Sequence, residues 1–346
     1  MLKNSTTFRL LAVFLIFSSV LTSCKKNKHK VDTGDIDVNI EIKRYEDWIF
    51  SVNDANDYEQ MVKQDTLFFK YYLNNIIGDV TGGNRVTDRE LKVRGLKEFI
   101  QYKDMQDLYQ NVKKEYEDLS DIEKNLSQAF TYYKYHFPDR EVPSVVTFVS
   151  PFRSGIACFE NQIGIGLDMF LGADFEPYLT PALGLPDYMI KKFRREYIVP
   201  NAVKAWLLSE FDPPAGKDRL LDKMVYDGKI LYTMDALLPD TRDSIKIGYF
   251  KGQLEWNREY EFQIFDYINS KDLMFTSNER SFMGLIQDGP FSKGEGVPQE
   301  APPRIAVWLG WQIVRAYMDQ HPDLTLAQLW EEIDSEKILK ESRYKP

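Results

Sequence analysis

The sequence predicts an α+β fold that is mostly α-helical and contains a small antiparallel β-sheet. Two observations predict the helices: apolar residues recur at helical spacing within residues 57–135 and again after Pro200. The third observation is a pair of short β-branched runs between these two regions. About 310 residues remain after an N-terminal leader and tether, which is enough for one large domain or two sharing an interface.

The first 23 residues have the character of a secretory signal. Lys3 and Arg9 precede an uncharged apolar run, Leu10 to Val20. This run of about 11 residues is far shorter than the roughly 20 that a membrane-spanning helix requires. It ends at Leu21-Thr22-Ser23-Cys24, a lipobox-like pattern whose small residues admit a signal peptidase and whose thiol can carry a lipid. We therefore predict a lipoprotein signal peptide over residues 1–23, rather than an ordinary signal with an incidental cysteine.

Residues 24–34 are predicted to be a lipidated basic tether. Lys25, Lys26, Lys28 and Lys30 make this stretch too polar to bury, and it is too short to fold alone. Acyl chains on Cys24 would anchor the protein to a membrane without a transmembrane helix. Because the tether lacks an acidic export-type cluster, the domain is expected to face the periplasm, from either membrane.

Charge argues against nucleic acid as a partner. Without the leader, 42 Lys and Arg residues stand against 53 Asp and Glu residues, a net charge of −11. Such a chain repels nucleic acid. Cys158 is the only other cysteine, so no internal disulfide is expected. Its apolar flank favours a buried, unreactive thiol over a nucleophile.

Residues 35–142 are predicted to form a mainly helical region that opens with one strand. Polar and apolar residues alternate from Asp35 to Ile42, which is the period of a half-buried strand. Ser120-Asp121-Ile122-Glu123 reads as a capping box at the start of a helix that Pro138 ends.

Residues 143–346 are predicted to hold the sheet and a second set of helices. Ser144–Phe148 and Ile163–Leu167 are the expected antiparallel strands. Helices are expected from Pro200, over 217–236, 245–269 and 303–319, and after the capping box Thr325-Leu326-Ala327-Gln328. Residues 281–303, rich in Gly and Pro, are expected to form a long loop.

Many fragments, in one order, resemble the GldB-type gliding-motility lipoproteins. They are Ile42–Glu46, Tyr133–Pro138, Ile163–Gly172, Pro186–Tyr188, Tyr197–Pro200, Asp227–Tyr232, Trp256-Asn257 and Pro303–Gly310. The resemblance implies a role in gliding and the associated secretion machinery, with other envelope proteins of these systems as partners. It also implies a zincin-like region over 143–346, packed with 35–142 as one globular unit.

The chain departs from zincin-like metallopeptidases at their metal motif. Those enzymes carry His-Glu-x-x-His on a helix, because histidines four residues apart share a face and can hold zinc together. The histidines here, His29, His136 and His321, lie far apart, and the corresponding helix, 201–210, contains none. Asp227 resembles a remnant of the third-ligand segment, and one carboxylate is too few for catalytic zinc. We therefore expect no metal, no cofactor and no peptidase activity.

Other catalytic patterns are weak in this sequence. Asp168 with Glu255, Glu259 or Glu261 could supply the two carboxylates of a glycosidase. However, Glu255 and Glu259 are four residues apart, and carboxylates at that spacing usually lie on the solvated face of a helix. No Gly-x-Ser-x-Gly elbow occurs, and the Gly164-Ile165-Gly166 run lacks the third glycine of a nucleotide loop.

The resemblance places Asp168, Asp227, Trp256, Asn257 and Arg304 on segments that line the cleft of zincin-like folds. Such a cleft, without its metal, could bind a peptide, a glycan or a partner protein. The alternative is structural: Trp256 in the core and Arg304 paired with a carboxylate near a helix start. The leading function is a non-catalytic scaffold, and a ligand-binding cleft or an unrecognised metal-free hydrolase remain as alternatives.

Overall fold

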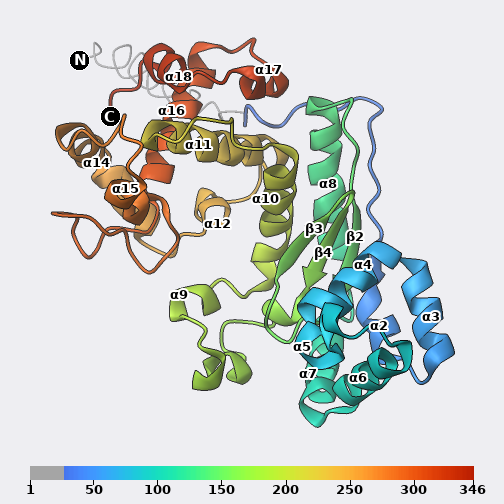
Figure 1. The fold of residues 1–346 in the computed structure, drawn as a ribbon. Helices are drawn as coiled ribbons and strands as arrows, with labels where there is room; N and C mark the ends of the chain where they lie inside the picture. Colours follow the sequence, from blue (N-terminus) through green and yellow to red (C-terminus); the bar gives the residue numbers. More distant parts are fainter. Residues whose placement is uncertain (1–26) are drawn as a thin grey trace, which may run out of the picture. The chain divides into compact units, whose positions relative to one another are not determined.

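A four-stranded mixed sheet lies between two groups of helices (Figure 1). The computed structural model describes residues 27–346, so the predicted signal peptide and Cys24 lie outside the described residues. Residues 33–346 form one compact unit. The strands are β1 (Ile42–Arg44), β2 (Ser144–Phe148), β3 (Ile156–Phe159) and β4 (Gln162–Gly166), in the spatial order β1-β2-β4-β3. The predicted α+β, mostly helical class is confirmed.

The expectation that β2 and β4 pair antiparallel is wrong. They run parallel, with Val145 opposite Ile163 and Thr147 opposite Ile165. The reason is β3, an intervening strand that was not predicted from the sequence. The chain leaves β2, runs back along β3, and turns tightly into β4, which fills the space between the two. Only β3 and β4 form an antiparallel pair.

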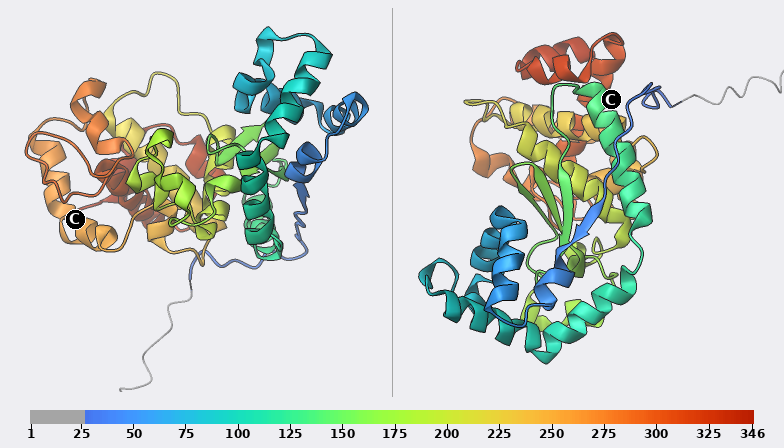
Figure 2. Two further views of the ribbon diagram at one scale, coloured as in Figure 1. Left: turned by 90° about the horizontal axis from the view of Figure 1, so that it is seen from below. Right: turned by 90° about the vertical axis from the view of Figure 1, so that its right-hand side faces the viewer.

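The alternating segment 35–41 is extended, but it is not a strand of the sheet. Instead it runs along α8 (Ser120–His136), as the right-hand view of Figure 2 shows. The backbone N–H groups of Val38, Ile40 and Ile42 donate to helix side chains at 3.1, 2.9 and 2.9 Å. The acceptors are Thr131, Ser127 and Glu123, one helical turn apart. The predicted strand over Asp35–Ile42 is therefore wrong: β1 begins only at Ile42, and along residues 35–41 a helix takes the place of the neighbouring strand.

The capping box predicted at Ser120 does not form, because both of its side chains have other partners, and the Ser120 hydroxyl donates to Asp118 at 2.9 Å. Leu119 occupies the N-cap of α8 without a side-chain cap hydrogen bond, and Ser120 is the first helical residue. Glu123 accepts from the N–H of Ile42 instead of reaching back to the helix start. The second predicted box is confirmed, because Thr325 and Gln328 bond each other's backbone N–H at α17.

The predicted helical region 57–135 is helical in several short pieces. Asp65 and Asp88 cap new helices, and Gly82 interrupts the chain at φ 80°. The pieces are α3 (Ala55–Gln64), α4 (Thr66–Tyr71), a π-helical turn (Tyr72–Ile76), α5 (Gly78–Thr81), a 3₁₀ turn (Gly83–Arg85), α6 (Arg89–Gln101), α7 (Lys103–Glu115) and α8, and the short helix α2 (Tyr45–Phe50) precedes them. Their aromatic side chains share one core with the sheet, in which Phe68 contacts Tyr45, Phe148 and Phe159.

The second group of helices is built around α11 (Leu220–Leu237) and α16 (Ile305–Gln320), which pack closely together. The single helix expected over 245–269 is broken, because Gly248 and Gly252 adopt φ of 75° and 86°. It becomes α12 (Asp243–Ile247), α13 (Gln253–Glu259) and α14 (Glu261–Ser270). The remaining elements are 3₁₀ turns at Leu167–Met169, Glu176–Leu179, Pro181–Leu183 and Arg195–Tyr197, with α9 (Asp187–Ile190), α10 (Ile198–Glu210), α15 (Glu279–Ile286), α17 (Leu326–Glu331) and α18 (Ser335–Ser342). The loop expected over 281–303 therefore begins only after α15.

Candidate functional site

Arg304 lies at the start of α16 and points its side chain into the protein. Its backbone adopts φ 60°, a left-handed conformation that is uncommon outside glycine. The residue is 9% exposed, and its Nε has no hydrogen-bond partner within the described residues. The nearest carboxylate oxygen, from Asp288, lies 3.7 Å from this Nε. Pairing with a carboxylate near a helix start, the structural alternative for Arg304, is therefore what the geometry shows.

Lys192 shares Asp288 with Arg304. Its Nζ lies 2.7 Å from the Asp288 carboxylate and its side chain is only 16% exposed. A Cβ added to Gly248 would lie 3.2 Å from Arg304 Nη2 and 3.6 Å from Lys192 Nζ, so this glycine leaves the room that both cations occupy. Burial raises the pKa of Asp288, but the two cations outweigh it and the net pKa is lowered. Asp288 is therefore a carboxylate held ionised between two cations.

Lys204 brings a third cation to this place from α10. Burial, with help from Arg304, lowers the pKa of Lys204 to about 8, and Asp227 and Asp288 oppose the shift. Burial raises the pKa of Asp227 on α11, and Lys204 and Arg304 oppose it. Lys204 on α10, Asp227 on α11 and Arg304 at the N-cap of α16 are therefore within electrostatic range of one another, without a direct ion pair within 4.0 Å among residues 27–346.

Tyr249 and Asn257 complete this group. The Tyr249 hydroxyl donates to the carbonyl oxygen of Arg304 at 3.4 Å and also faces Asn257. Asn257 is fully buried, and its Nδ2 donates to Gln253 one turn earlier at 3.2 Å. We call the seven residues the polar cluster: Lys192, Lys204, Asp227, Tyr249, Asn257, Asp288 and Arg304.

Of the five residues singled out in the sequence, Asp227, Asn257 and Arg304 belong to the polar cluster, whereas Trp256 and Asp168 do not. Trp256 is partly exposed on α13 and stacks on Tyr260 with ring centroids 4.6 Å apart. It is therefore neither a core residue nor a contact of the cluster.

Asp168 is a buried support for a loop beside the sheet. Its carboxylate accepts from Ser150 N at 2.7 Å, Ser150 Oγ at 3.1 Å and Phe152 N at 2.6 Å. Burial raises the pKa of Asp168 to about 6, and these hydrogen bonds oppose the shift. All the side-chain acceptor contacts that the structure gives this residue go to residues 150–152, so its geometry indicates a structural role.

Four members of the polar cluster were not predicted from the sequence: Lys192, Lys204, Tyr249 and Asp288. Lys204 alone left a signal, because it is the only charged residue in the apolar run Ile198–Leu208. A cation in such a run needs a polar partner when it is buried. The others come from a basic run and two loops, where charged and polar residues are ordinary.

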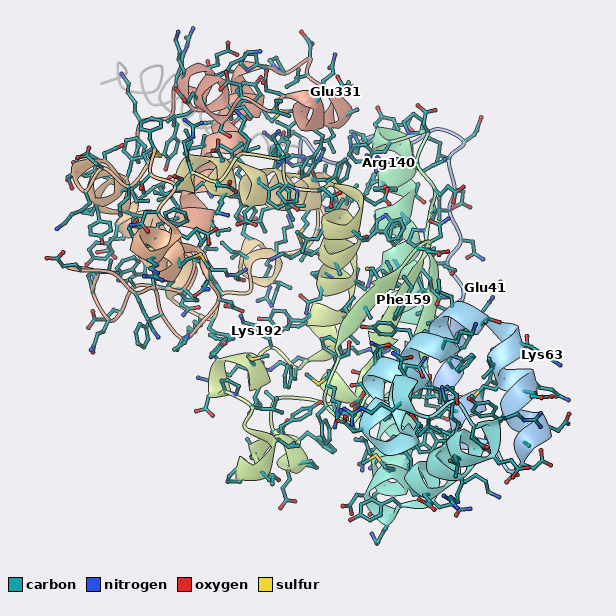
Figure 3. All side chains as sticks on the ribbon, in the orientation of Figure 1. Glu41, Lys63, Arg140, Phe159, Lys192 and Glu331 are labelled. Atoms are coloured by element: carbon teal, nitrogen blue, oxygen red, sulfur yellow. The ribbon has the colours of Figure 1, made fainter. Side chains whose placement is uncertain are left out.

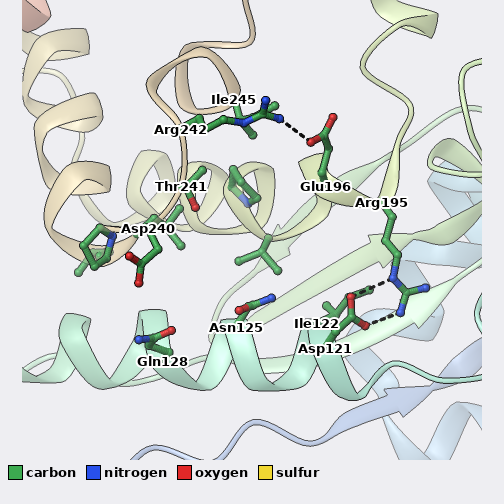
Figure 4. Close-up of a pocket in the computed structure, with 15 residues that line it drawn as sticks. Asp121, Ile122, Asn125, Gln128, Arg195, Glu196, Asp240, Thr241, Arg242 and Ile245 are labelled. Carbon is green, nitrogen blue, oxygen red and sulfur yellow. Dashed lines mark hydrogen bonds and ion pairs between the residues drawn. The ribbon is translucent and has the colours of Figure 1, made fainter. Parts of the chain in front are cut away.

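A groove lies beside the polar cluster and consists of two cavities with a common wall. The first, about 540 Å³, is lined by α8, the end of α11 and the loop after it, and Figure 4 shows it. The second, about 860 Å³, lies against α12, α13 and residues 191–197, and Tyr249 of the polar cluster lines it. Glu196, Arg242 and Ile245 line both cavities, and the Glu196–Arg242 ion pair measures 2.9 Å.

Cys158 lies on β3, partly buried. Burial raises the pKa of its thiol, and Ser209 partly opposes the shift. A raised pKa keeps the sulfur protonated, which disfavours nucleophilic chemistry.

Lys204→Met is expected to flatten the dependence of stability on alkaline pH. In the folded protein the pKa of Lys204 lies near 8 rather than 10.5, so the folded state holds this proton less tightly than the unfolded chain. The free energy of unfolding therefore rises as the pH increases from about 8 to about 10. Methionine removes the titration, and Lys229, whose pKa is also lowered to about 8, leaves part of the rise in place. Urea unfolding across this range measures the effect. Exposed Lys70→Met is the control, and an unchanged slope in Lys204→Met would contradict the prediction.

Residues 27–346 contain no group of three or more His, Cys, Asp and Glu side chains placed to hold a metal ion. In the same residues, no helix has both the length and the apolar character needed to cross a bilayer.

Comparison with known proteins identifies the family. No curated protein and no solved structure matches the chain significantly. The family model described as "Gliding motility protein GldB" matches residues 26–346, nearly the whole chain. The chain therefore belongs to the GldB family and is a gliding-motility-related lipoprotein of the cell envelope.

Proposed function

We propose that this protein serves gliding and the associated secretion machinery as a non-catalytic scaffold or interaction protein. In this proposal the lipid on Cys24 anchors it to a membrane, its domain faces the periplasm, and other envelope proteins of these systems are its partners. The family supports the gliding role. The scaffold role, the link to secretion and the orientation are our extension of it.

The observation that carries the proposal is the charge of the polar cluster. The resemblance to zincin-like enzymes would put a metal-binding helix at α10, and that helix instead contributes Lys204. Lys192 and Arg304 lie beside it, so three cations stand against Asp227 and Asp288. The two carboxylates are taken up by these cations, and ammonium and guanidinium groups have no lone pair to offer a divalent cation. The residues present therefore do not fit a zinc centre.

The cluster also neutralises most of its own charge. Asp288 is hydrogen-bonded to Lys192 and lies next to Arg304. The positive charges of Lys204 and Arg304 act on the Asp227 carboxylate and oppose the rise in its pKa. Such a cluster holds α10, α11, α16 and the loop after α15 together, which is a structural role. Because its charged groups are used in this way, the cluster supports a protein that acts through its surface and not through catalysis.

The full-length protein, purified from membranes in detergent, provides the test. We expect far less than one zinc per chain by mass spectrometry and no cleavage of a peptide-substrate library. A photo-crosslinker at the partly exposed Trp256 should yield discrete protein adducts in gliding cells. Glu41, on the extended segment, is a second position for the crosslinker. Stoichiometric zinc, with turnover that one substitution abolishes, would refute the proposal.

Cys24→Ser is expected to release the protein from the membrane. Without the thiol there is no lipid, and the described residues contain no helix suited to cross a bilayer. Cell fractionation followed by immunoblotting should find the variant in the soluble fraction and the native protein in the membrane fraction. Membrane retention of a variant from which residues 1–23 have been cleaved, as its mass would show, would contradict lipid anchoring. Removal of the native domain by protease added to intact cells would contradict the periplasmic orientation.

A further inference from the structure

The larger cavity of the groove is basic, although the whole chain carries a net charge of −9. Its lining includes five basic side chains, Lys191, Arg194, Arg242, Lys251 and Arg258, and three acidic ones, Glu196, Asp243 and Glu255. A positive cavity on a negative protein concentrates anionic ligands.

Two of the three acidic side chains are already neutralised. Glu196 pairs with Arg242 at 2.9 Å, and Asp243 accepts two bonds from Arg315 at 2.9 and 3.0 Å. By contrast, Lys191, Arg194 and Lys251 have no carboxylate within 4.0 Å among residues 27–346. All three are exposed, so their charges are available to a ligand.

The same cavity offers apolar and aromatic surface between these charges. The Phe250 ring lies beside the ammonium groups of Lys191 and Lys192, at 5.7 and 6.0 Å from its centroid. Tyr197 and Leu254 supply a largely buried lining beneath it. A ligand that fits this cavity therefore has apolar groups as well as negative charge.

The neighbouring cavity offers groups that bind a peptide backbone. Asn125 and Gln128, one turn apart on α8, line it with exposed side-chain amides (Figure 4). A side-chain amide both donates and accepts, so it can pair with the N–H and C=O of an extended chain. The linings of the two cavities have Glu196, Arg242 and Ile245 in common, so the cavities are neighbours on either side of the Glu196–Arg242 ion pair and together make up the groove.

We propose that this groove binds an extended acidic peptide segment of a partner protein. Acidic side chains of the segment contact Lys191, Arg194 and Lys251, an apolar side chain packs on Phe250, and the backbone meets Asn125 and Gln128. The inference rests on the proposed function as an interaction protein and specifies the partner's chemistry.

Two other anionic occupants fit less well. A bilayer surface is flat and cannot enter a concave groove. A uniformly charged polyanion would meet Glu255 in the larger cavity, and this carboxylate has no cation within 4.0 Å among residues 27–346. A peptide avoids this repulsion because its acidic residues can be confined to one end.

The test uses full-length protein in detergent and a display library of random peptides of about 12 residues. We expect selected peptides to be enriched in Asp and Glu together with an aromatic or aliphatic residue. The best peptide is then labelled, and its Kd is measured by fluorescence anisotropy. Arg194→Glu with Lys251→Glu should weaken binding by about tenfold or more, because it reverses two charges in the groove.

The matched control is Lys63→Glu with Lys70→Glu. It makes the same charge change at exposed positions of α3 and α4. Figure 3 shows Lys63 on these N-terminal helices, well apart from Lys192 beside the groove. We expect this control to change Kd by no more than about twofold.

The inference is overturned if selected peptides are not acidic, or if both double variants bind them equally. It is also overturned if a carboxylated oligosaccharide, or vesicles of phosphatidylglycerol, bind the groove and the peptide does not. Protein adducts from Trp256 that persist in Arg194→Glu/Lys251→Glu would defeat this groove and leave the scaffold proposal standing. Zinc-dependent turnover would defeat the scaffold proposal, whereas the groove would still be judged by the Kd of the selected peptide.

Discussion

Asp235→Asn is expected to lower the free energy of unfolding by about 3–5 kcal/mol, because it removes the carboxylate that is hydrogen-bonded to buried Lys246 and leaves Arg315 with Asp243 alone. Asp235 on α11 is 2% exposed. Its carboxylate accepts from Lys246 at 2.8 Å, from Arg315 at 2.8 and 2.9 Å, and from Trp311 at 3.0 Å. Asparagine keeps the shape but carries no charge and presents an N–H₂ group toward one of these donors.

Urea unfolding followed by circular dichroism measures this loss at neutral pH. Asp323→Asn, at an exposed position after α16, is the matched control and should change stability by less than about 0.5 kcal/mol. A loss below about 1 kcal/mol in Asp235→Asn would show that the contacts of Asp235 with Lys246, Arg315 and Trp311 contribute little to the stability of the helices around α11 and α16.

The same residue should contribute to acid sensitivity. Burial raises the pKa of Asp235, but Arg315 and Lys246 outweigh burial and the net pKa is lowered. The folded carboxylate therefore binds a proton less readily than the unfolded one. Its stabilising contribution is present above about pH 4 and is lost as the pH falls through the folded pKa, and Asp235→Asn should remove this part of the acid dependence.

Gly310→Ala is expected to cost more than about 3 kcal/mol, or to prevent folding altogether, because α11 and α16 cross with their backbones in contact. A Cβ at Gly310 would overlap the carbonyl oxygen of Met224 and lie 2.5 Å from its carbonyl carbon. A Cβ at Gly228 on α11 would overlap the carbonyl oxygen of Gly310 in turn. These obstacles are backbone atoms, so the methyl group can be accommodated only if the helices separate.

Soluble yield and urea unfolding together measure this effect. Gly289→Ala is the control, since its added Cβ would meet nothing closer than Phe291 O at 3.6 Å, and its φ is not in the left-handed region. We expect Gly289→Ala to be neutral or slightly stabilising. A Gly310→Ala protein with native yield and stability would show that the two helices can move apart at little cost.

The sequence predicted well those features that depend on neighbouring residues. Thr325 and Gln328 form their capping box because both partners lie within one turn. The α8 helix ends at His136, two residues before Pro138. Ser120 and Glu123 had the same pattern as Thr325 and Gln328, but Asp118 accepts from the Ser120 hydroxyl, and a segment from 81 residues earlier in the chain bonds the Glu123 carboxylate. Local pattern sets what is possible, and a distant competitor can override it.

The sequence alone determined the family, the mostly helical class and the absence of the paired histidines of a zinc helix, because each is written in residue types and short spacings. Only the tertiary structure decided how the sheet is ordered and which charges meet. Lys192 and Asp288 are 96 residues apart in the chain, yet their side chains bond at 2.7 Å. Lys204, Asp227 and Arg304 come from three different helices. No local spacing encodes these encounters, since packing of α10, α11 and α16 is what brings the charges out of water and makes them partners.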